Sequence, residues 1–371
     1  MQVTVIPSWY PNNYQPFLGT FIREQVSMMK GNDLSMHLLG AIPISVKFGI
    51  RPLALEPIET PFVKFFPSIP GLRHASYKRS LSKGMKMFEK YIQTHGEPDL
   101  LHIHSYLQGY LALAIREKYD LPFVVTEHYT RLLNATNLAR WEYNLAKQLY
   151  SKSAGNFAVS NYFADILQAN FGVEFHTIPN FINMDRFVPA HGENDNQDYQ
   201  LISIGALTKR KGMDILLNSV HILHRKGLTV SLKIIGDGEE RDTLQSYCRQ
   251  SGIESQVTFL PFVSNSELPH HLQSADCFVI ASEVETFGVV VVEALASGVP
   301  SIVTAEAPKM FIQNGYNGYI SDRDPESLAD RIEQCMRLNS TPEQIRETVS
   351  KKYSAGVVKK QLLDTYQSVI A

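Results

Sequence analysis

Short apolar runs alternate with amphipathic stretches along almost the whole chain. The apolar runs are rich in Val, Ile, Leu and Phe without strict alternation, as in strands buried on both faces. This strand–helix alternation predicts parallel sheets in doubly wound α/β domains. Strands are expected at 2–6, 35–41, 99–103, 122–126, 155–159 and 174–178, and then at 200–205, 229–235, 256–260, 276–280 and 300–303.

A chain of 371 residues exceeds the size of about 250–300 residues at which one hydrophobic core stops growing. We therefore expect two Rossmann-like domains, over 1–187 and 188–354. A last helix, within 355–371, should pack back on the first domain. The most polar segment between the two halves is His191–Gln200, which reads as a linker or an exposed loop.

Composition excludes several classes of protein. The formal net charge of −2 disfavours a strongly basic nucleic-acid binder. Three cysteines without a Cys-x-x-Cys spacing disfavour a disulfide framework or a thiolate zinc site. The sequence has neither a signal-peptide pattern at its start nor an apolar run long enough to span a membrane. We expect a cytoplasmic protein.

Missing motifs narrow the chemistry further. The sequence has no G-x-x-x-x-G-K-[ST] loop, which disfavours a P-loop NTPase. Gly236-Asp237-Gly238 lacks the third glycine of G-x-G-x-x-G, which disfavours a dehydrogenase.

The most informative segment runs from Ser282 to Gly298, directly after a predicted strand. Phe287-Gly288 should open a helix, with Glu285 in the loop ahead of it and Glu293 about two turns further on. Backbone N–H groups at a helix N-terminus attract phosphate, and a glycine permits its close approach. A carboxylate beside them can accept hydrogen bonds from sugar hydroxyls. The pattern around the two glutamates is too specific for an ordinary loop.

Glu285-x7-Glu293 within Ser-x-x-Glu-x-Phe-Gly resembles the signature of glycosyltransferase family 4, the group 1 glycosyltransferases with the GT-B fold. The resemblance extends over nearly the whole chain. The segment Ile204 to Gly212 resembles the first donor-phosphate loop of that family. Further similar segments are Ile235–Gly238, Ser8–Pro11 with Gly19–Phe21, His102–His104, Thr126–His128 and Ile178–Asn180.

The resemblance implies two domains that face each other across a cleft, the first binding acceptor and the second binding a UDP- or GDP-linked sugar. Glu293 would hold the ribose, and Glu285 the donor sugar. Lys211 would neutralise the leaving diphosphate without a metal or other cofactor. The other implied donor-side residues are Gly205, Lys209, Arg210, Phe287 and Gly288. His104 would lie near the scissile bond, and Gly19, Glu127 and His128 would line the acceptor side. His102 is assigned to the other face of its strand, with a structural role.

Two positions depart from the family pattern. Ala206 stands where an arginine is common after the glycine of the first phosphate loop, so Lys209 or Arg210 would have to substitute for that cation. The segment Ala305 to Met310 replaces a Gly-Gly-x-x-Glu stretch, so the identity of the donor cannot be carried over.

The stretch from Tyr77 to Ile92 predicts an amphipathic helix. Arg79, Lys83, Lys86 and Lys90 should share one face, opposite an apolar face, and Gly84 should weaken the helix by roughly 1 kcal/mol. A solvated surface helix and a patch that contacts anionic lipid headgroups are both open readings. Lipid-linked acceptors in the family favour the second.

Together these features predict a retaining glycosyltransferase that acts on a hydroxyl of a glycan or lipid-linked saccharide, in cell-surface polysaccharide biosynthesis. It would be cytoplasmic, on the inner face of the cytoplasmic membrane if the 79–90 patch binds lipid. The alternatives are a nucleotide-sugar 2-epimerase on the same fold and a degenerate protein that binds nucleotide-sugar without activity.

Overall fold

The computed structural model describes all residues except 16–17, 30, 32–33, 46–61, 69–70 and 191–197. The chain forms two compact units, one of Met1–Asn180 with Val358–Ala371 and one of Phe181–Val357. The division therefore falls at 180 and 357, where the sequence suggested 187 and 354. Most of the expected linker, His191–Gln200, lies outside the described residues.

The first unit is built on a six-stranded parallel sheet with the strand order β2-β1-β5-β6-β7-β8. The expected strand at 35–41 is divided, because Leu39 separates β2 from β3. β3 leaves the main sheet and pairs in parallel with β4, a strand that the sequence did not predict. The strands are β1 (Gln2–Pro7), β2 (Ser35–Leu38), β3 (Gly40–Ser45), β4 (Val63–Ser68), β5 (Leu100–His104), β6 (Phe123–Glu127), β7 (Gly155–Ala158) and β8 (His176–Thr177).

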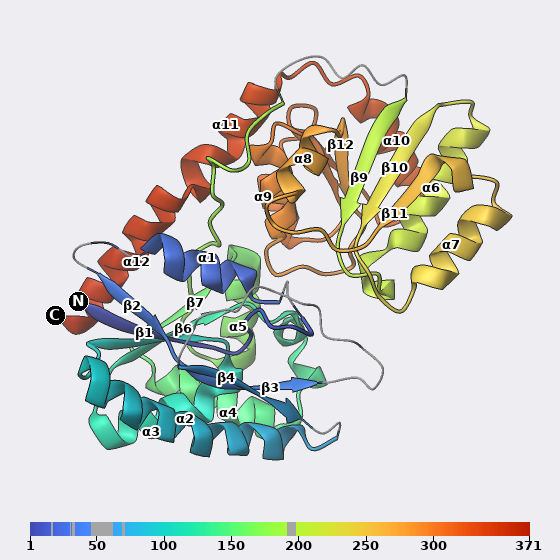
Figure 1. Cartoon of the computed structure of the whole chain (residues 1–371). Coiled ribbons are helices and arrows are strands. Elements are labelled where there is room, and N and C mark those ends of the chain that lie inside the picture. The colour runs from blue at the N-terminus through green and yellow to red at the C-terminus, as the bar shows by residue number, and fades with distance from the viewer. Residues whose placement is uncertain (16–17, 30, 32–33, 46–61, 69–70, 191–197) are drawn as a thin grey trace. The chain divides into compact units, whose positions relative to one another are not determined.

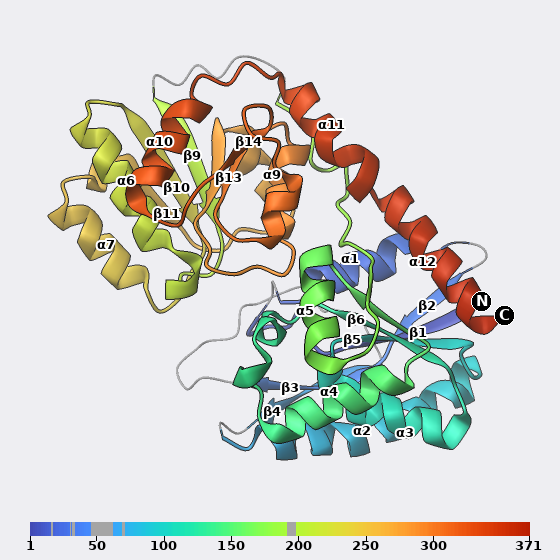
Figure 2. The same ribbon diagram turned by 180° about the vertical axis from the view of Figure 1, so that it is seen from behind.

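Three helices of the first unit, α2, α3 and α4, lie side by side along one face of this sheet (Figure 2). Gly84 of α2 faces Leu111 of α3, and a Cβ at position 84 would come within 2.6 Å of the leucine side chain. The glycine therefore allows close helix packing, which offsets its low helix propensity. The helices are α1 (Thr20–Met29), α2 (Arg73–His95), α3 (Gly109–Tyr119), α4 (Arg140–Lys152), α5 (Asn161–Phe171) and α12 (Ala355–Ile370).

The C-terminal helix α12 is fixed to the first unit by polar contacts, one of them fully buried. The Tyr366 hydroxyl lies 2.7 Å from His102 Nδ1 of β5, and both side chains are fully buried. Lys359 Nζ donates to the Met28 carbonyl of α1 at 3.2 Å. Because a buried hydroxyl or imidazole is costly to leave without a partner, the His102–Tyr366 pair specifies where α12 docks.

The second unit contains another six-stranded parallel sheet, with the order β11-β10-β9-β12-β13-β14 (Figures 1 and 2). Numbered within the unit, this is 3-2-1-4-5-6, the order of a dinucleotide-binding Rossmann fold. Its strands are β9 (Tyr199–Ile204), β10 (Val230–Ile235), β11 (Val257–Leu260), β12 (Cys277–Ile280), β13 (Ser301–Val303) and β14 (Gly318–Ile320). The sequence did not predict β14, which has only three residues.

Two helices of the second unit, α10 and α11, begin at residues whose side chains cap them. Asp324 caps α10 by accepting from the Ser327 N–H at 2.9 Å, and Thr341 caps α11 in a capping box with Gln344. The helices are α6 (Met213–Arg225), α7 (Arg241–Gln250), α8 (Leu268–Gln273), α9 (Val289–Ala296), α10 (Pro325–Cys335) and α11 (Pro342–Tyr353). The predicted doubly wound α/β class is confirmed for both units.

Each sheet has one point where the strand order reverses, and ligands of doubly wound sheets bind beside the carboxyl ends of the strands there. In the first unit this point lies between β1 and β5, and in the second between β9 and β12. Four loops are thereby singled out: those after β1 and β5, and those after β9 and β12.

Candidate functional site

In the second unit, the loops after β9 and β12 bring Lys211 and Glu285 into direct contact. Lys211 ends the short 3₁₀ helix Lys209–Lys211, and its Nζ forms an ion pair with Glu285 Oε1. The Lys211 side chain is 20% exposed and that of Glu285 is 12% exposed, so the pair is partly shielded from water. Two residues 74 positions apart are thus paired at the switch point of the sheet.

Close backbone packing holds these two loops together. Gly212 has φ +65, and a Cβ there would lie 2.2 Å from the Ala281 carbonyl oxygen. The Glu283 N–H donates to the Arg210 carbonyl at 2.8 Å. Arg323, from the loop after β14, donates to the carbonyls of Ala281 at 3.0 Å and Lys209 at 3.3 Å. The sequence did not indicate a role for Arg323, because β14, the strand before it, was not predicted.

The other residues of the predicted phosphate loop lie nearby. Gly205 packs against the Lys211 stem, and its carbonyl oxygen lies so close to Gly236 that a Cβ on Gly236 would approach it to 1.9 Å. Gly236 thus permits close contact between the loop after β10, which carries it, and the loop after β9, which carries Gly205. Ala206, Lys209 and Arg210 are exposed, so both candidate substitutes for the missing arginine lie at the surface of this loop.

The segment around α9 combines a buried aromatic ring, a glycine start and a buried carboxylate. Phe287 is 2% exposed and packs edge-on against Phe311 and Tyr353, with ring centroids 5.0 and 5.9 Å away. Gly288 has φ +91 and immediately precedes α9, and Glu293 within α9 is 8% exposed. The backbone N–H groups that begin α9 therefore follow directly on the loop that carries Glu285.

The segment 305–310, which departs from the family pattern, packs against this helix start. A Cβ at Gly288 would lie 2.9 Å from Pro308 Cγ. Lys309 forms an ion pair with Glu306 at 2.5 Å, so the charges of this segment are matched locally. The departure therefore changes the surroundings of the α9 N-terminus directly.

In the first unit, two histidines lie at the carboxyl ends of neighbouring strands: His104 ends β5, and His128 directly follows β6. His104 Nδ1 lies 2.9 Å from His128 Nε2, and the two rings are nearly parallel. Phe21 of α1 packs on His128 with ring centroids 4.6 Å apart. Gly19, just ahead of α1, has φ +77, and a Cβ there would lie 2.6 Å from the Trp9 carbonyl oxygen. The loop after β1 is thereby drawn close to this pair.

The assignment of His102 to the opposite face of β5 is wrong. Residues two apart on a strand share a face, and the rings of His102 and His104 are 4.3 Å apart. His102 is structural nonetheless, because its two nitrogens lie 2.7 Å from Tyr366 and from Thr126 Oγ1. Burial lowers the pKa of His102 and of His128 to about 3, and burial together with the neighbouring imidazoles holds that of His104 well below its usual value.

Two family models match adjoining parts of the chain. The model described as Glycosyltransferase Family 4 matches residues 49–186, and that described as Glycosyl transferases group 1 matches residues 185–352. The chain belongs to the group 1 glycosyltransferases of family 4. The resemblance read from Glu285 and Glu293 is thereby confirmed, and the protein is an enzyme of glycosyl transfer.

Individual relatives agree with this family. The α-monoglucosyldiacylglycerol synthase of Acholeplasma laidlawii is 26% identical over 96% of this chain and 95% of its own length. An uncharacterised glycosyltransferase of Methanocaldococcus jannaschii is 31% identical, but the match spans 46% of this chain and only 45% of that relative. The crystal structure of the Anabaena protein HepE with UDP has a TM-score of 0.77 at 17% identity, over 99% of this chain and 100% of that one. The GT-B fold expected from the sequence is confirmed.

In this glycosyltransferase Glu127 points away from the histidine pair, toward the helices on the other face of the sheet. Its Oε1 accepts from the Tyr106 N–H at 2.6 Å and from the Tyr150 hydroxyl at 2.7 Å. The side chain is fully buried, and burial raises the pKa of its carboxyl group from 4.5 to about 7. Glu127 thus supports the turn that directly follows His104, the last residue of β5.

The raised pKa of Glu127 predicts a pH-dependent stability. Because folding disfavours the charged form, this contribution is complete below pH 4.5 and is lost as the pH rises through about 7. Glu127→Gln keeps the accepting oxygen but cannot ionise. From pH 4.5 to 8 the parent should lose on the order of 3 kcal/mol of unfolding free energy relative to this variant.

Urea unfolding of both proteins at several pH values measures this difference. The buried histidines titrate in both proteins and cancel in the comparison. If the unfolding free energies of parent and variant change with pH in parallel, the prediction is wrong, and burial costs the charged form of Glu127 little.

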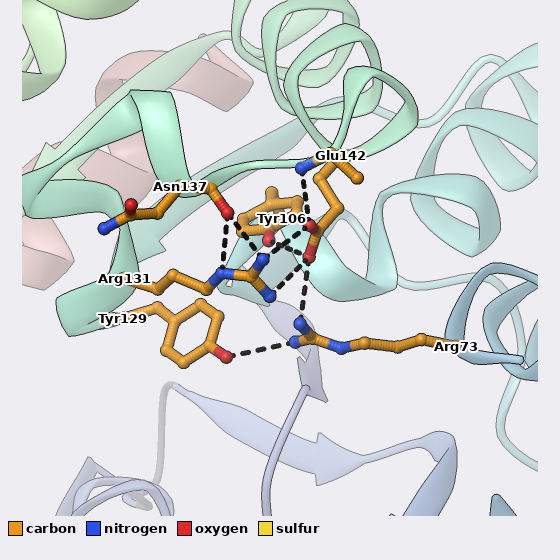
Figure 3. Close-up of polar contacts among 7 residues, drawn as sticks. Arg73, Tyr106, Tyr129, Arg131, Asn137 and Glu142 are labelled. Carbon is orange, nitrogen blue, oxygen red and sulfur yellow. Dashed lines mark hydrogen bonds and ion pairs between the residues drawn. The ribbon is translucent and has the colours of Figure 1, made fainter. Parts of the chain in front are cut away.

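A second buried carboxylate, Glu142, joins three segments near the same edge of the first sheet (Figure 3). Its side chain is 2% exposed and forms ion pairs with Arg73 at 3.0 Å and Arg131 at 3.3 Å. It also accepts from the Tyr106 hydroxyl at 3.0 Å, and Arg73 donates to the Tyr129 hydroxyl at 3.0 Å. The cluster ties the start of α2 to the loop after β6 and to α4. No sequence pattern indicated it, because its members are far apart in the chain.

Proposed function

We propose that this enzyme transfers a sugar from a UDP- or GDP-linked donor to a hydroxyl of a glycan or lipid-linked saccharide, with retention at the anomeric carbon, in cell-surface polysaccharide biosynthesis. The observation that carries the proposal is the donor-type constellation at the second switch point. Lys211 and Glu285 form an ion pair there, Glu285 lies in the loop just ahead of α9, and Glu293 lies within that helix.

Each donor-side residue then has a defined task. Glu293 accepts hydrogen bonds from the ribose hydroxyls, and Glu285 from those of the donor sugar. Lys211 and the first N–H groups of α9 stabilise the diphosphate as it gains charge. Gly205, Phe287 and Gly288 present backbone to the phosphates, and Lys209 or Arg210 supplies the cation that Ala206 lacks. This set neutralises the leaving group without a metal ion.

Transfer on the same face of the sugar fits these residues. The bond from the anomeric carbon to the phosphate oxygen breaks as the acceptor oxygen bonds to that carbon. The departing phosphate takes the acceptor proton, so no protein nucleophile is needed. Gly19, His104 and His128 line the acceptor side, with His104 nearest the scissile bond. Glu127 was expected there, and we assign it to positioning the turn after β5.

Relatives support the choice of donor and acceptor classes. HepE was crystallised with UDP and with UDP-glucose, and the Acholeplasma relative is named as a synthase of a glycolipid.

A ligand that binds the folded state raises the melting temperature by mass action. A panel of UDP- and GDP-sugars in a thermal-shift assay therefore identifies the donor.

Turnover assays with that donor separate the possible functions. Release of nucleoside diphosphate that depends on an added saccharide acceptor, with an α-linked product from an α-linked donor by NMR, supports the proposal. Isomerisation of the donor without acceptor would identify a 2-epimerase. Donor binding without any turnover over a broad acceptor panel would identify a binding-only protein.

We also propose that α2 docks the enzyme on an anionic membrane surface, on the inner face of the cytoplasmic membrane. Arg79, Lys83, Lys86 and Lys90 are all exposed, and Leu72, just ahead of the helix, is 53% exposed. Each basic residue near such a surface contributes about 1 kcal/mol. No helix within the described residues is long and apolar enough to cross a membrane.

Replacing these four basic residues with Gln should abolish binding to vesicles that contain anionic lipid, without unfolding the protein. Parent binding should weaken with salt, because the attraction is screened within about 8–10 Å. Co-sedimentation at low and high salt measures both effects. A control replaces four other exposed lysines, Lys147, Lys152, Lys352 and Lys360, and should retain binding. Absence of parent binding at low salt would show that the basic face is only solvated.

A further inference from the structure

The ion pair between Lys211 and Glu285 occupies two side chains that the proposed function assigns to the donor. Both residues are expected to touch the donor, yet each is already the partner of the other. The aliphatic stem of Lys211 packs beside Gly205, so the pair lies next to the predicted phosphate loop. A diphosphate that binds Lys211 must therefore compete with the Glu285 carboxylate.

The two loops cannot relieve this competition by moving apart. The Glu283 N–H to Arg210 carbonyl bond and the contact of Gly212 with Ala281 join them beside the pair. Arg323 joins the same two loops by binding the carbonyls of Ala281 and Lys209. The carboxylate therefore remains near any phosphate that Lys211 binds, and like charges at that range repel each other.

We propose that Glu285 makes the site select intact nucleotide-sugar over nucleoside diphosphate, and that it drives product release by recapturing Lys211. This inference rests on the proposed donor site. A nucleotide-sugar brings hydroxyl groups that donate to Glu285 and so compensate it for the loss of Lys211. A nucleoside diphosphate lacks the donor sugar, and its ribose hydroxyls are assigned to Glu293. Once the sugar has left with the acceptor, Glu285 pairs with Lys211 again, and the diphosphate loses its cation.

The proposal predicts opposite effects for the two glutamates of one segment. Glu285→Gln removes the competing charge and keeps the side-chain shape, so it should bind nucleoside diphosphate about fivefold more tightly, the effect of removing a partly exposed ion pair. Its affinity for the nucleotide-sugar should not rise, and product inhibition should become stronger. Glu293→Gln, the matched control, should weaken nucleoside diphosphate binding.

Calorimetric titration of the full chain with UDP and GDP, and with UDP-glucose and GDP-mannose, tests this. A double-mutant cycle adds Lys211→Ala, in whose background Glu285→Gln should change diphosphate affinity by no more than about twofold. Glu285→Ala repeats the measurement with a second substitution and should also bind the diphosphate more tightly than the parent.

The possible outcomes separate this inference from the proposed function. Tighter diphosphate binding by Glu285→Gln that depends on Lys211 supports the inference. Unchanged or weaker binding, with Glu293→Gln still weakening it, overturns the inference and leaves the donor site standing. If Glu285→Gln tightens diphosphate binding equally in the Lys211→Ala background, the inference is also overturned. Direct repulsion between Glu285 and the diphosphate would then explain the effect without Lys211. A parent that binds none of the four probes overturns both.

Discussion

Lys211→Ala should lower turnover by about two to three orders of magnitude, the loss that follows removal of one group that stabilises developing charge. The negative charge that Lys211 balances grows as the diphosphate departs, so its contribution belongs mainly to the transition state. The melting temperature should change little, because the lysine is partly exposed and its one ion pair within the described part of the chain is with Glu285. Release of nucleoside diphosphate at saturating donor measures this effect.

The neighbouring cations provide the control for this prediction. Lys209→Ala and Arg210→Ala remove exposed charges from the same 3₁₀ helix. One of them should reduce turnover if it replaces the cation absent at Ala206, but neither should approach the effect of Lys211. Turnover within about threefold of the parent in Lys211→Ala, less than 1 kcal/mol of transition-state stabilisation, would remove this lysine from the chemistry.

Glu293→Ala should weaken nucleotide binding by about 10- to 100-fold. The ribose hydroxyls lose a charged acceptor, which contributes about 1.5–3 kcal/mol. Because Glu293 is 8% exposed inside α9, its carboxylate is shielded from water and its hydrogen bonds are correspondingly strong. Isothermal titration with the preferred nucleotide measures the loss.

Glu283→Ala is a suitable control for Glu293→Ala. This exposed glutamate lies in the same segment and contacts Arg210 only through its backbone N–H among the contacts described. Its replacement should leave nucleotide affinity within about twofold, as expected for a surface substitution. Equal affinities for all three proteins would exclude Glu293 from the ribose site.

The sheets could be predicted from the sequence wherever strands are long and apolar. The runs that became β9 and β12 contain consecutive buried residues, the run that became β10 alternates buried and half-buried residues, and all three read clearly as strands. β4 and β14 were not predicted, because β4 contains Lys64 and Pro67 and β14 has only three residues. Their positions are set by neighbouring strands, and such tertiary effects leave little trace in local sequence.

The sequence predicts which residues form the candidate site, but not the contacts among them. The Glu285–Glu293 spacing and the glycines after β9 predict the donor loops. The pairing of Lys211 with Glu285 depends on strand order, which places the loops after β9 and β12 side by side. The cluster around Glu142 depends on how α2 and α4 pack. The inward orientation of Glu127 follows from its strand register, because Phe123 and Val125 share its face.

A crystal structure of the enzyme with its preferred nucleotide-sugar tests the central claim most directly. The proposed site predicts the ribose hydroxyls on Glu293 and the diphosphate between Lys211 and the first N–H groups of α9, within hydrogen-bond distance of each. A nucleotide bound elsewhere, or bound there without contact to Lys211 and Glu293, would contradict the account.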